Sequence, residues 1–134
     1  MQTFVTGGTG LVGSHLMLEL LKQDRAVRAL KRPKSDLSKI RRTFGWYVKN
    51  PDELFNRIQW VDGDMLDYYA LEDALEGVAH IYHCAGMVSF NSNQGNEMLR
   101  INQQGTANLV NASLEKQVKK LCHVSSVSEL GRSR

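Results

Sequence analysis

Short apolar runs alternate with segments of helical periodicity along the whole 134-residue chain. The apolar runs have the length of strands and lie at residues 2–6, 26–30, 58–61, 78–84 and 120–124. Between them, apolar residues recur at intervals typical of one helix face, most clearly over 11–22, 67–76 and 93–116. Because strands separated by helices pair in parallel through right-handed crossovers, the pattern predicts one α/β unit without an internal repeat or a linker.

Several of the predicted helices have residues at their ends that favour a helix boundary. Ser35 or Asp36 is a candidate cap for a short helix after the second strand, and Pro51 suits the first turn of the next helix. Asp67 is placed to cap the helix before the fourth strand, and Gly77 stands where a glycine commonly ends a helix.

Three glycines, Gly7, Gly10 and Gly13, lie between the first strand and the first helix. At this spacing Gly7 permits a tight turn out of the strand, Gly10 lets the backbone approach a pyrophosphate, and Gly13 allows close packing of the helix on the strand. The unpaired amides and the positive dipole end of the helix would then face the anion. Turns also use glycine without any ligand, but this context favours a dinucleotide-phosphate site.

The segment Thr6–Leu16, which reads TGGTGLVGSHL, resembles the start of the extended short-chain dehydrogenase/reductase family of the epimerase/dehydratase type. That family uses the same Gly-x-x-Gly-x-x-Gly spacing. Four further segments are similar to the family's in the same order, namely Asp64-Met65, His83-Cys84-Ala85-Gly86, Asn102-Gln103-Gln104-Gly105-Thr106 and Val124-Ser125-Ser126. The resemblance therefore extends along the whole chain.

This resemblance implies a Rossmann-type doubly wound parallel sheet of strand order 3-2-1-4-5, truncated before the last strands. Residues 1–134 would form an NAD(P)-binding domain without the C-terminal substrate-binding part, and the cofactor would cross the carboxyl edge between the first and fourth strands. In the family, the pair at Asp64 contacts adenine, the segment at Cys84 lies beside the ribose, and Asn102 supports the ribose or a water network. The predicted cofactor-binding residues are Gly7, Gly10, Leu11, Val12, Gly13, Lys31, Arg32, Asp64, Met65, Cys84, Ala85, Gly86 and Asn102.

The end of the second strand bears on the choice between NADP and NAD. NAD sites usually place an acidic residue there to hold the ribose 2′-hydroxyl, whereas this chain has Lys31 and Arg32, with Lys34 nearby. Both can pair with a 2′-phosphate, and arginine can do so bidentately. Dihydroflavonol-reductase-like members of the family use an arginine at the position of Arg32 in this way. We therefore expect NADP, with NAD as an alternative; the other interpretation of the two residues is solvated surface charge.

The family's chemistry is hydride transfer at a carbonyl or secondary alcohol, with a tyrosine–lysine pair and a serine. By resemblance Ser126 is that serine. The chain contains no Tyr-x-x-x-Lys; the resemblance implies that the pair follows Ser126 on the next helix, beyond Arg134. The 134-residue chain is therefore expected to bind cofactor weakly at best and not to turn over. For the complete enzyme we expect an NADP-dependent reductase of the dihydroflavonol-reductase or hydroxysteroid-dehydrogenase type. A nucleotide-sugar epimerase or dehydratase and a non-catalytic NADP-sensing domain are the alternatives.

Composition narrows these expectations further. A net charge of +3 and a pI near 9.0 are too mild for a nucleic-acid binder and suit a solvated surface or an anionic ligand. Cys84 and Cys122 lie in apolar runs, as free thiols of a reducing compartment do. No apolar run has membrane-spanning length, so a cytoplasmic protein with a small-molecule substrate is expected.

His80 and His83 are three apart on a strand, which disfavours a shared metal. The fifth strand would be an exposed edge, which makes a homodimer possible.

Overall fold

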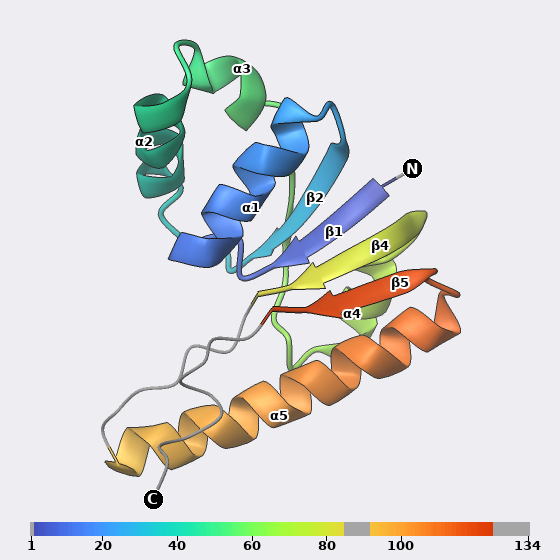
Figure 1. The fold of residues 1–134 in the computed structure, drawn as a ribbon. Helices are drawn as coiled ribbons and strands as arrows, with labels where there is room; N and C mark the ends of the chain where they lie inside the picture. Colours follow the sequence, from blue (N-terminus) through green and yellow to red (C-terminus); the bar gives the residue numbers. More distant parts are fainter. Residues whose placement is uncertain (1, 85–91, 125–134) are drawn as a thin grey trace, which may run out of the picture.

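The computed structural model describes residues 2–84 and 92–124, which form a parallel five-stranded sheet (Figure 1). The strand order is β3-β2-β1-β4-β5, as predicted. The strands are β1 (Gln2–Thr6), β2 (Ala26–Lys31), β3 (Gln59–Asp62), β4 (Val78–His83) and β5 (Lys120–His123), and every neighbouring pair is parallel. The predicted strand positions agree with these bounds to within one residue.

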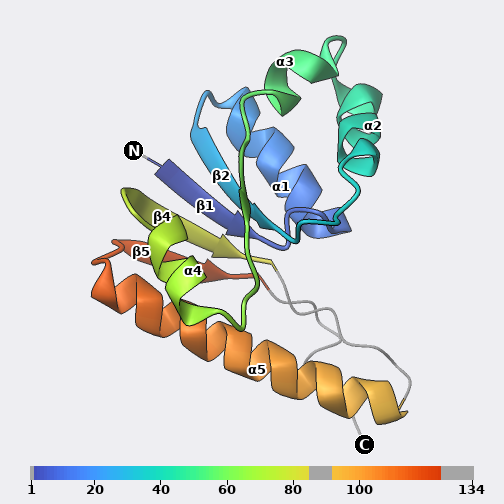
Figure 2. The ribbon, with the colours of Figure 1, turned by 180° about the vertical axis from the view of Figure 1, so that it is seen from behind.

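Helices cover both faces of the sheet, which confirms the doubly wound architecture (Figures 1 and 2). One face carries α1 (Leu11–Lys22), α2 (Ser38–Tyr47) and α3 (Pro51–Phe55), and the other carries α4 (Tyr68–Ala74) and α5 (Ser92–Glu115). Because successive strand residues point to opposite faces, Val5 packs into the core under α1 whereas Phe4 packs into the core under α4 and α5. Both side chains are fully buried.

The helix ends confirm the predicted caps except one. The Asp67 carboxylate accepts the Ala70 N–H at 3.1 Å, and Gly77 has a φ of +76°, in the left-handed region that glycine adopts easily. The prediction for α2 was wrong: its N-cap residue is Leu37, without a side-chain cap. The Asp36 carboxylate accepts the N–H and the hydroxyl of Ser38 instead, a local turn that competes with capping.

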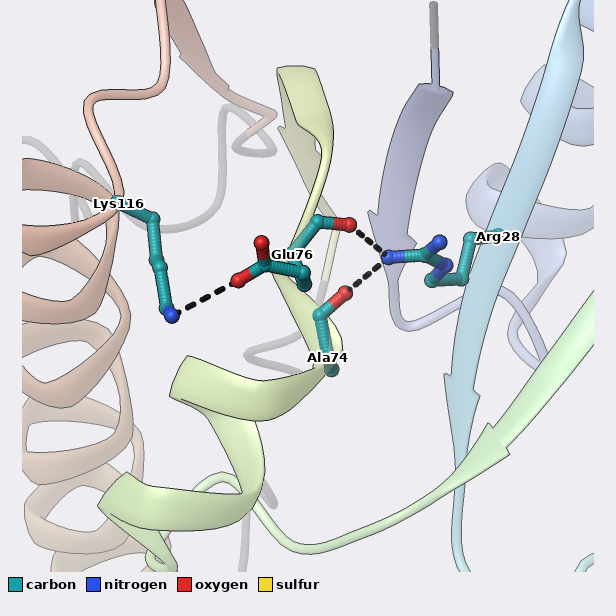
Figure 3. Close-up of polar contacts among 4 residues, drawn as sticks. All are labelled: Arg28, Ala74, Glu76 and Lys116. Carbon is teal, nitrogen blue, oxygen red and sulfur yellow. Dashed lines mark hydrogen bonds and ion pairs between the residues drawn. The ribbon is translucent and has the colours of Figure 1, made fainter.

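Charged side chains connect the elements at the amino edge of the sheet (Figure 3). Arg28 on β2 donates from Nη1 to the backbone carbonyls of Ala74 and Glu76, both at 2.7 Å. The Glu76 carboxylate in turn pairs with the Lys116 ammonium just after α5, at 2.9 Å. These contacts attach β2 and the last turn of α5 to the segment between α4 and β4.

Candidate functional site

The site lies at the carboxyl edge of the sheet, where β1 has β2 on one side and β4 on the other. In open α/β sheets the crevice at such a reversal of strand order is where ligands bind. Thr6 and His83 are the last residues of β1 and β4 and are register partners across this point. The glycine turn begins directly after Thr6, so the fold brings the predicted phosphate-binding residues to the topological switch point.

The glycine turn has the geometry that the spacing predicts. Gly7 has a φ of +70°, which L side chains rarely adopt. A Cβ on Gly13 would lie 2.1 Å from the Gly7 carbonyl oxygen, so the helix touches the turn through backbone atoms alone. A Cβ on Gly10 would meet only that same oxygen, at 3.4 Å. The backbone conformation thus requires glycine at position 7 and close packing requires it at position 13, whereas a Cβ at position 10 would make only an ordinary van der Waals contact.

The first turn of α1 is left available to a ligand. Gly10 is its N-cap residue and provides no side-chain cap, and the Ser14 amide closes the first helical hydrogen bond onto the Gly10 carbonyl at 2.9 Å. The amides before Ser14 therefore have no partner inside the helix. Leu11 and Val12 are 71% and 56% exposed although both are apolar. The free amide donors and the positive dipole end suit a dinucleotide phosphate.

A buried histidine joins three elements beneath this turn. The His83 ring lies 2.6 Å from the Thr6 hydroxyl through Nδ1 and 2.9 Å from the Thr106 hydroxyl on α5 through Nε2. His83 is 2% exposed, and its ring meets that of His123 edge-to-face at 5.1 Å. Burial, aided by the charge of His123, lowers the pKa of His83 to about 4. The imidazole is therefore neutral at pH 7, and one of its nitrogens donates while the other accepts.

Residues on α5 complete the edge on the side of β4. The side-chain nitrogen of Asn102 is buried and has no hydrogen-bond partner among the described residues. Such a donor is costly unless a ligand or water fills its place. Asn108 donates to the Met65 carbonyl at 3.0 Å, and the Asp64 carboxylate accepts the Leu66 N–H at 2.9 Å. Met65 is thus held against α5, whereas the Asp64 carboxylate forms a local turn. By resemblance, this pair contacts adenine.

The two basic residues after β2 differ in their surroundings. The Lys31 ammonium pairs with the Asp62 carboxylate at the end of β3, at 2.5 Å, and its side chain is only 18% exposed. Arg32 is exposed and has no ion pair among the described residues. A 2′-phosphate would therefore meet Arg32 as a free cation, and Lys31 as a cation already neutralised. The structure separates two residues that the sequence presented as equivalent.

Three of the predicted site residues, Ala85, Gly86 and Ser126, lie outside the described residues. Cys84 is described: it is half-buried, and its N–H donates to the Thr6 carbonyl at 3.1 Å. Burial raises the pKa of its thiol, so the thiol stays protonated at pH 7. Both Cys84 and Cys122 are free thiols, as expected. No group of metal-ligating side chains occurs in the described part of the chain, and none of its helices is long and apolar enough to span a membrane.

Sequence reasoning missed four residues that shape this edge: Thr6, Asp62, His83 and Thr106. Each lies within or beside a segment that carries the family resemblance. In each segment, however, a neighbouring residue was predicted to bind the cofactor instead. Thr6 and His83 could have been found from the predicted strand ends, because both end neighbouring parallel strands. The contact of His83 with Thr106 depends on side-chain packing between elements that are distant in the chain, and so does the pairing of Lys31 with Asp62. Neither contact has a signal in the local sequence.

The fold and the site define a dinucleotide-binding domain of the Rossmann type. Residues 3–134 match the model of the NAD dependent epimerase/dehydratase family, and the chain belongs to this family.

Named relatives agree with this assignment, and a solved structure shares the fold. Sterol demethylase protein B of Methylococcus capsulatus is 33% identical over 131 residues, which cover 98% of this chain and 36% of the relative. The decarboxylating sterol-4-alpha-carboxylate 3-dehydrogenase of Bos taurus is 34% identical over 92% of this chain and 30% of its own length. A UDP-glucose-4-epimerase of Stenotrophomonas maltophila, solved with bound NAD, shares the fold with a TM-score of 0.78 at 22% identity, over 99% of this chain and 39% of that one. The chain thus spans about a third of the length of the curated relatives it matches.

Proposed function

We propose that this chain binds NADP(H) and forms the cofactor-binding part of a reductase of the dihydroflavonol-reductase or hydroxysteroid-dehydrogenase type. The observation that carries the proposal is the uncapped start of α1 behind the glycine turn, at the switch point of the sheet. An anion is the ligand that such a helix start binds best. When bound, the nicotinamide would supply the hydride that reduces a ketone to a secondary alcohol.

Six of the predicted residues then have a specific role. The amides of Leu11 and Val12 would bind the pyrophosphate, with Gly10 leaving it room to approach the backbone. Arg32 would pair with the 2′-phosphate, since its guanidinium is exposed and unpaired among the described residues. Asp64 would face the adenine, and the unpartnered amide nitrogen of Asn102 would donate to the ribose or to a water network.

The relatives support a carbonyl or alcohol substrate. The Bos taurus relative is named a decarboxylating sterol-4-alpha-carboxylate 3-dehydrogenase. On this basis we propose a small-molecule ketone or alcohol as the substrate of the complete enzyme, with Ser126 orienting the substrate oxygen. A cytoplasmic location and a homodimer remain part of the proposal.

An NAD-dependent epimerase or dehydratase is the second candidate, and Asp62 favours it. Its carboxylate lies beside Lys31, at the end of the strand next to β2. A carboxylate in this region is how NAD sites usually hold the ribose 2′-hydroxyl, and its charge would oppose a 2′-phosphate. The balance between Arg32 and Asp62 thus distinguishes the two candidates.

Titration of the chain with NADPH and NADH tests the choice. We expect tighter binding of NADPH, and we expect Arg32→Ser to weaken NADPH binding about tenfold while NADH binding stays unchanged, because a charge-assisted contact is lost. The matched control is the double variant Lys31→Met with Asp62→Asn, which removes the ion pair without changing the net charge and should alter the NADPH affinity less. Equal affinities, or tighter binding of NADH, would overturn the proposal in favour of the second candidate.

A further inference from the structure

Three side chains from three elements form one buried polar connection under the glycine turn. Thr6 ends β1, His83 ends β4, and Thr106 lies in the middle of α5. The imidazole bridges the two hydroxyls, which belong to residues 77 and 23 positions away from it along the chain. Thr6 is fully buried, and His83 is 2% exposed. The ring is therefore shielded from any ligand that lies on the edge above it.

Both ends of this connection lead to residues that the proposed function uses. Thr6 is bonded directly to Gly7, the residue whose positive φ starts the phosphate-binding turn. Thr106 lies one helical turn after Asn102, on the same face of α5, because residues four apart in a helix are neighbours. His83 thus connects the start of the phosphate site with the helix face that carries the unpartnered Asn102 amide.

We propose that His83 is a positioning residue for the cofactor, which through Thr6 and Thr106 holds the glycine turn and the Asn102 face of α5 at a fixed separation. This inference rests on the proposed function and adds a residue that touches no ligand itself. An apolar side chain would fill the same space, but only a group with two hydrogen-bonding ends connects β1 to α5 here. A neutral imidazole is such a group, with one donor and one acceptor.

The connection affects affinity because binding requires both sides of the site at once. A turn or helix that moves freely must be ordered when the cofactor binds, and the cost of that ordering is subtracted from the affinity. Removal of one hydroxyl frees the turn relative to α5 and also leaves a ring nitrogen buried without a partner. Among the residues that the structure describes, the polar groups that face the His83 ring are the hydroxyls of Thr6 and Thr106 and the imidazole of His123.

The experiment compares Thr106→Val with Thr106→Ser by titration with NADPH. Valine keeps the shape of threonine and removes only the hydroxyl, and serine retains the hydroxyl. We expect the dissociation constant of Thr106→Val to rise about tenfold, which corresponds to ~1.4 kcal/mol, and that of Thr106→Ser to stay near the wild-type value. His83→Gln should weaken binding at least as much as Thr106→Val.

His80→Gln is the control for a purely structural effect. His80 is on the same strand, but its Nδ1 accepts from Arg25 at 3.0 Å, at the amino edge. This variant should lose thermal stability without losing NADPH affinity. If Thr106→Val and His83→Gln lower the melting temperature but bind NADPH like the wild type, the connection serves only the fold and the proposal is overturned.

Amide chemical shifts of the ligand-free chain give a readout that does not depend on the cofactor. Thr106→Val should move the Gly7 and Gly10 amide resonances, although these glycines are far from residue 106 in sequence, whereas His80→Gln should not. Unmoved glycine resonances would overturn the proposal even if affinity fell. A wild-type chain that binds neither NADPH nor NADH would contradict the proposed function and, with it, the role of His83, but would leave the shift result intact as a test of the connection.

Discussion

The two edges of the same sheet are built from different chemistry. At the amino edge, charged side chains connect the elements: Arg28 binds two backbone carbonyls, Arg25 binds His80, and Lys116 pairs with Glu76. At the carboxyl edge, the connection under the glycine turn consists of two hydroxyls and a neutral imidazole. Charged groups at a solvated edge remain hydrated, so each of their contacts adds little to the free energy of unfolding. Hydrogen bonds between buried neutral groups contribute more to the free energy of unfolding. If one partner is lost, water cannot reach the other, and a buried polar group is left unpaired.

This difference matches the ligand that we propose. An anionic cofactor is held best by helix amides and by one free guanidinium, without further fixed charges beneath the turn. A protonated histidine in the position of His83 would be a buried charge and would have to be compensated. Beneath the glycine turn the carboxyl edge therefore combines rigidity with neutrality, and the Lys31–Asp62 ion pair of this edge lies further along it, at the ends of β2 and β3. The amino edge only holds the elements together. The predictions below test this division, from the largest expected effect to the smallest.

Gly13→Ala should have the largest effect, because it places a Cβ 2.1 Å from the Gly7 carbonyl oxygen, a backbone atom that cannot move aside as a flexible side chain could. We expect a loss of about 3 kcal/mol or more in the free energy of unfolding, together with the loss of cofactor binding. Urea denaturation measures the first and NADPH titration the second. Gly45→Ala on α2 is the matched control, because its Cβ would meet only Pro51, at 3.8 Å, and alanine there should stabilise the helix by ~0.5 kcal/mol. Equal stability of the two variants would contradict the described contact.

Low pH should decrease the free energy of unfolding, because His83 is buried as a neutral imidazole at the carboxyl edge. The pKa of His83 is lowered from 6.5 to about 4 in the folded chain. Between pH 4 and pH 6.5, the imidazole is therefore protonated in the unfolded chain but neutral in the folded chain. Stability is therefore complete above pH 6.5 and is lost as pH falls toward 4. Between pH 7 and pH 5 the loss should be about 2 kcal/mol in urea denaturation. His83→Gln should abolish this part of the pH dependence, and His80→Gln should keep it; a wild-type stability that is flat over the range would show that His83 is not held neutral.

Arg28→Met should have a smaller effect, confined to stability. The variant removes a charged donor from the carbonyls of Ala74 and Glu76, which we expect to cost about 1.5 kcal/mol. NADPH affinity should not change, because these contacts lie at the opposite edge of the sheet from the glycine turn. Lys116→Met removes only the exposed pair with Glu76 and should produce the smallest change in melting temperature, one that high salt abolishes. A fall in NADPH affinity for either variant would show that the two edges are coupled.

Much of the architecture was predictable because its signals are local. The strand positions and the order β3-β2-β1-β4-β5 followed from periodicity together with the family resemblance. Gly7 and Gly13 occupy the conformations that their spacing predicted, since a turn from strand to helix leaves few alternatives. The start of α2 was not predictable in this way, because Asp36 can either cap a helix or form a turn with Ser38, and both patterns look the same in sequence.

The sequence by itself determined the sheet, the place of the glycine turn and the presence of two basic residues after β2. These follow from the spacing of residues a few positions apart. Only the tertiary structure decided that Lys31 is paired with Asp62 and that Arg32 is not, and that His83 connects Thr6 with Thr106. The physical reason is that these contacts join elements distant in the chain, whose register and side-chain packing are set by the whole core rather than by any local pattern.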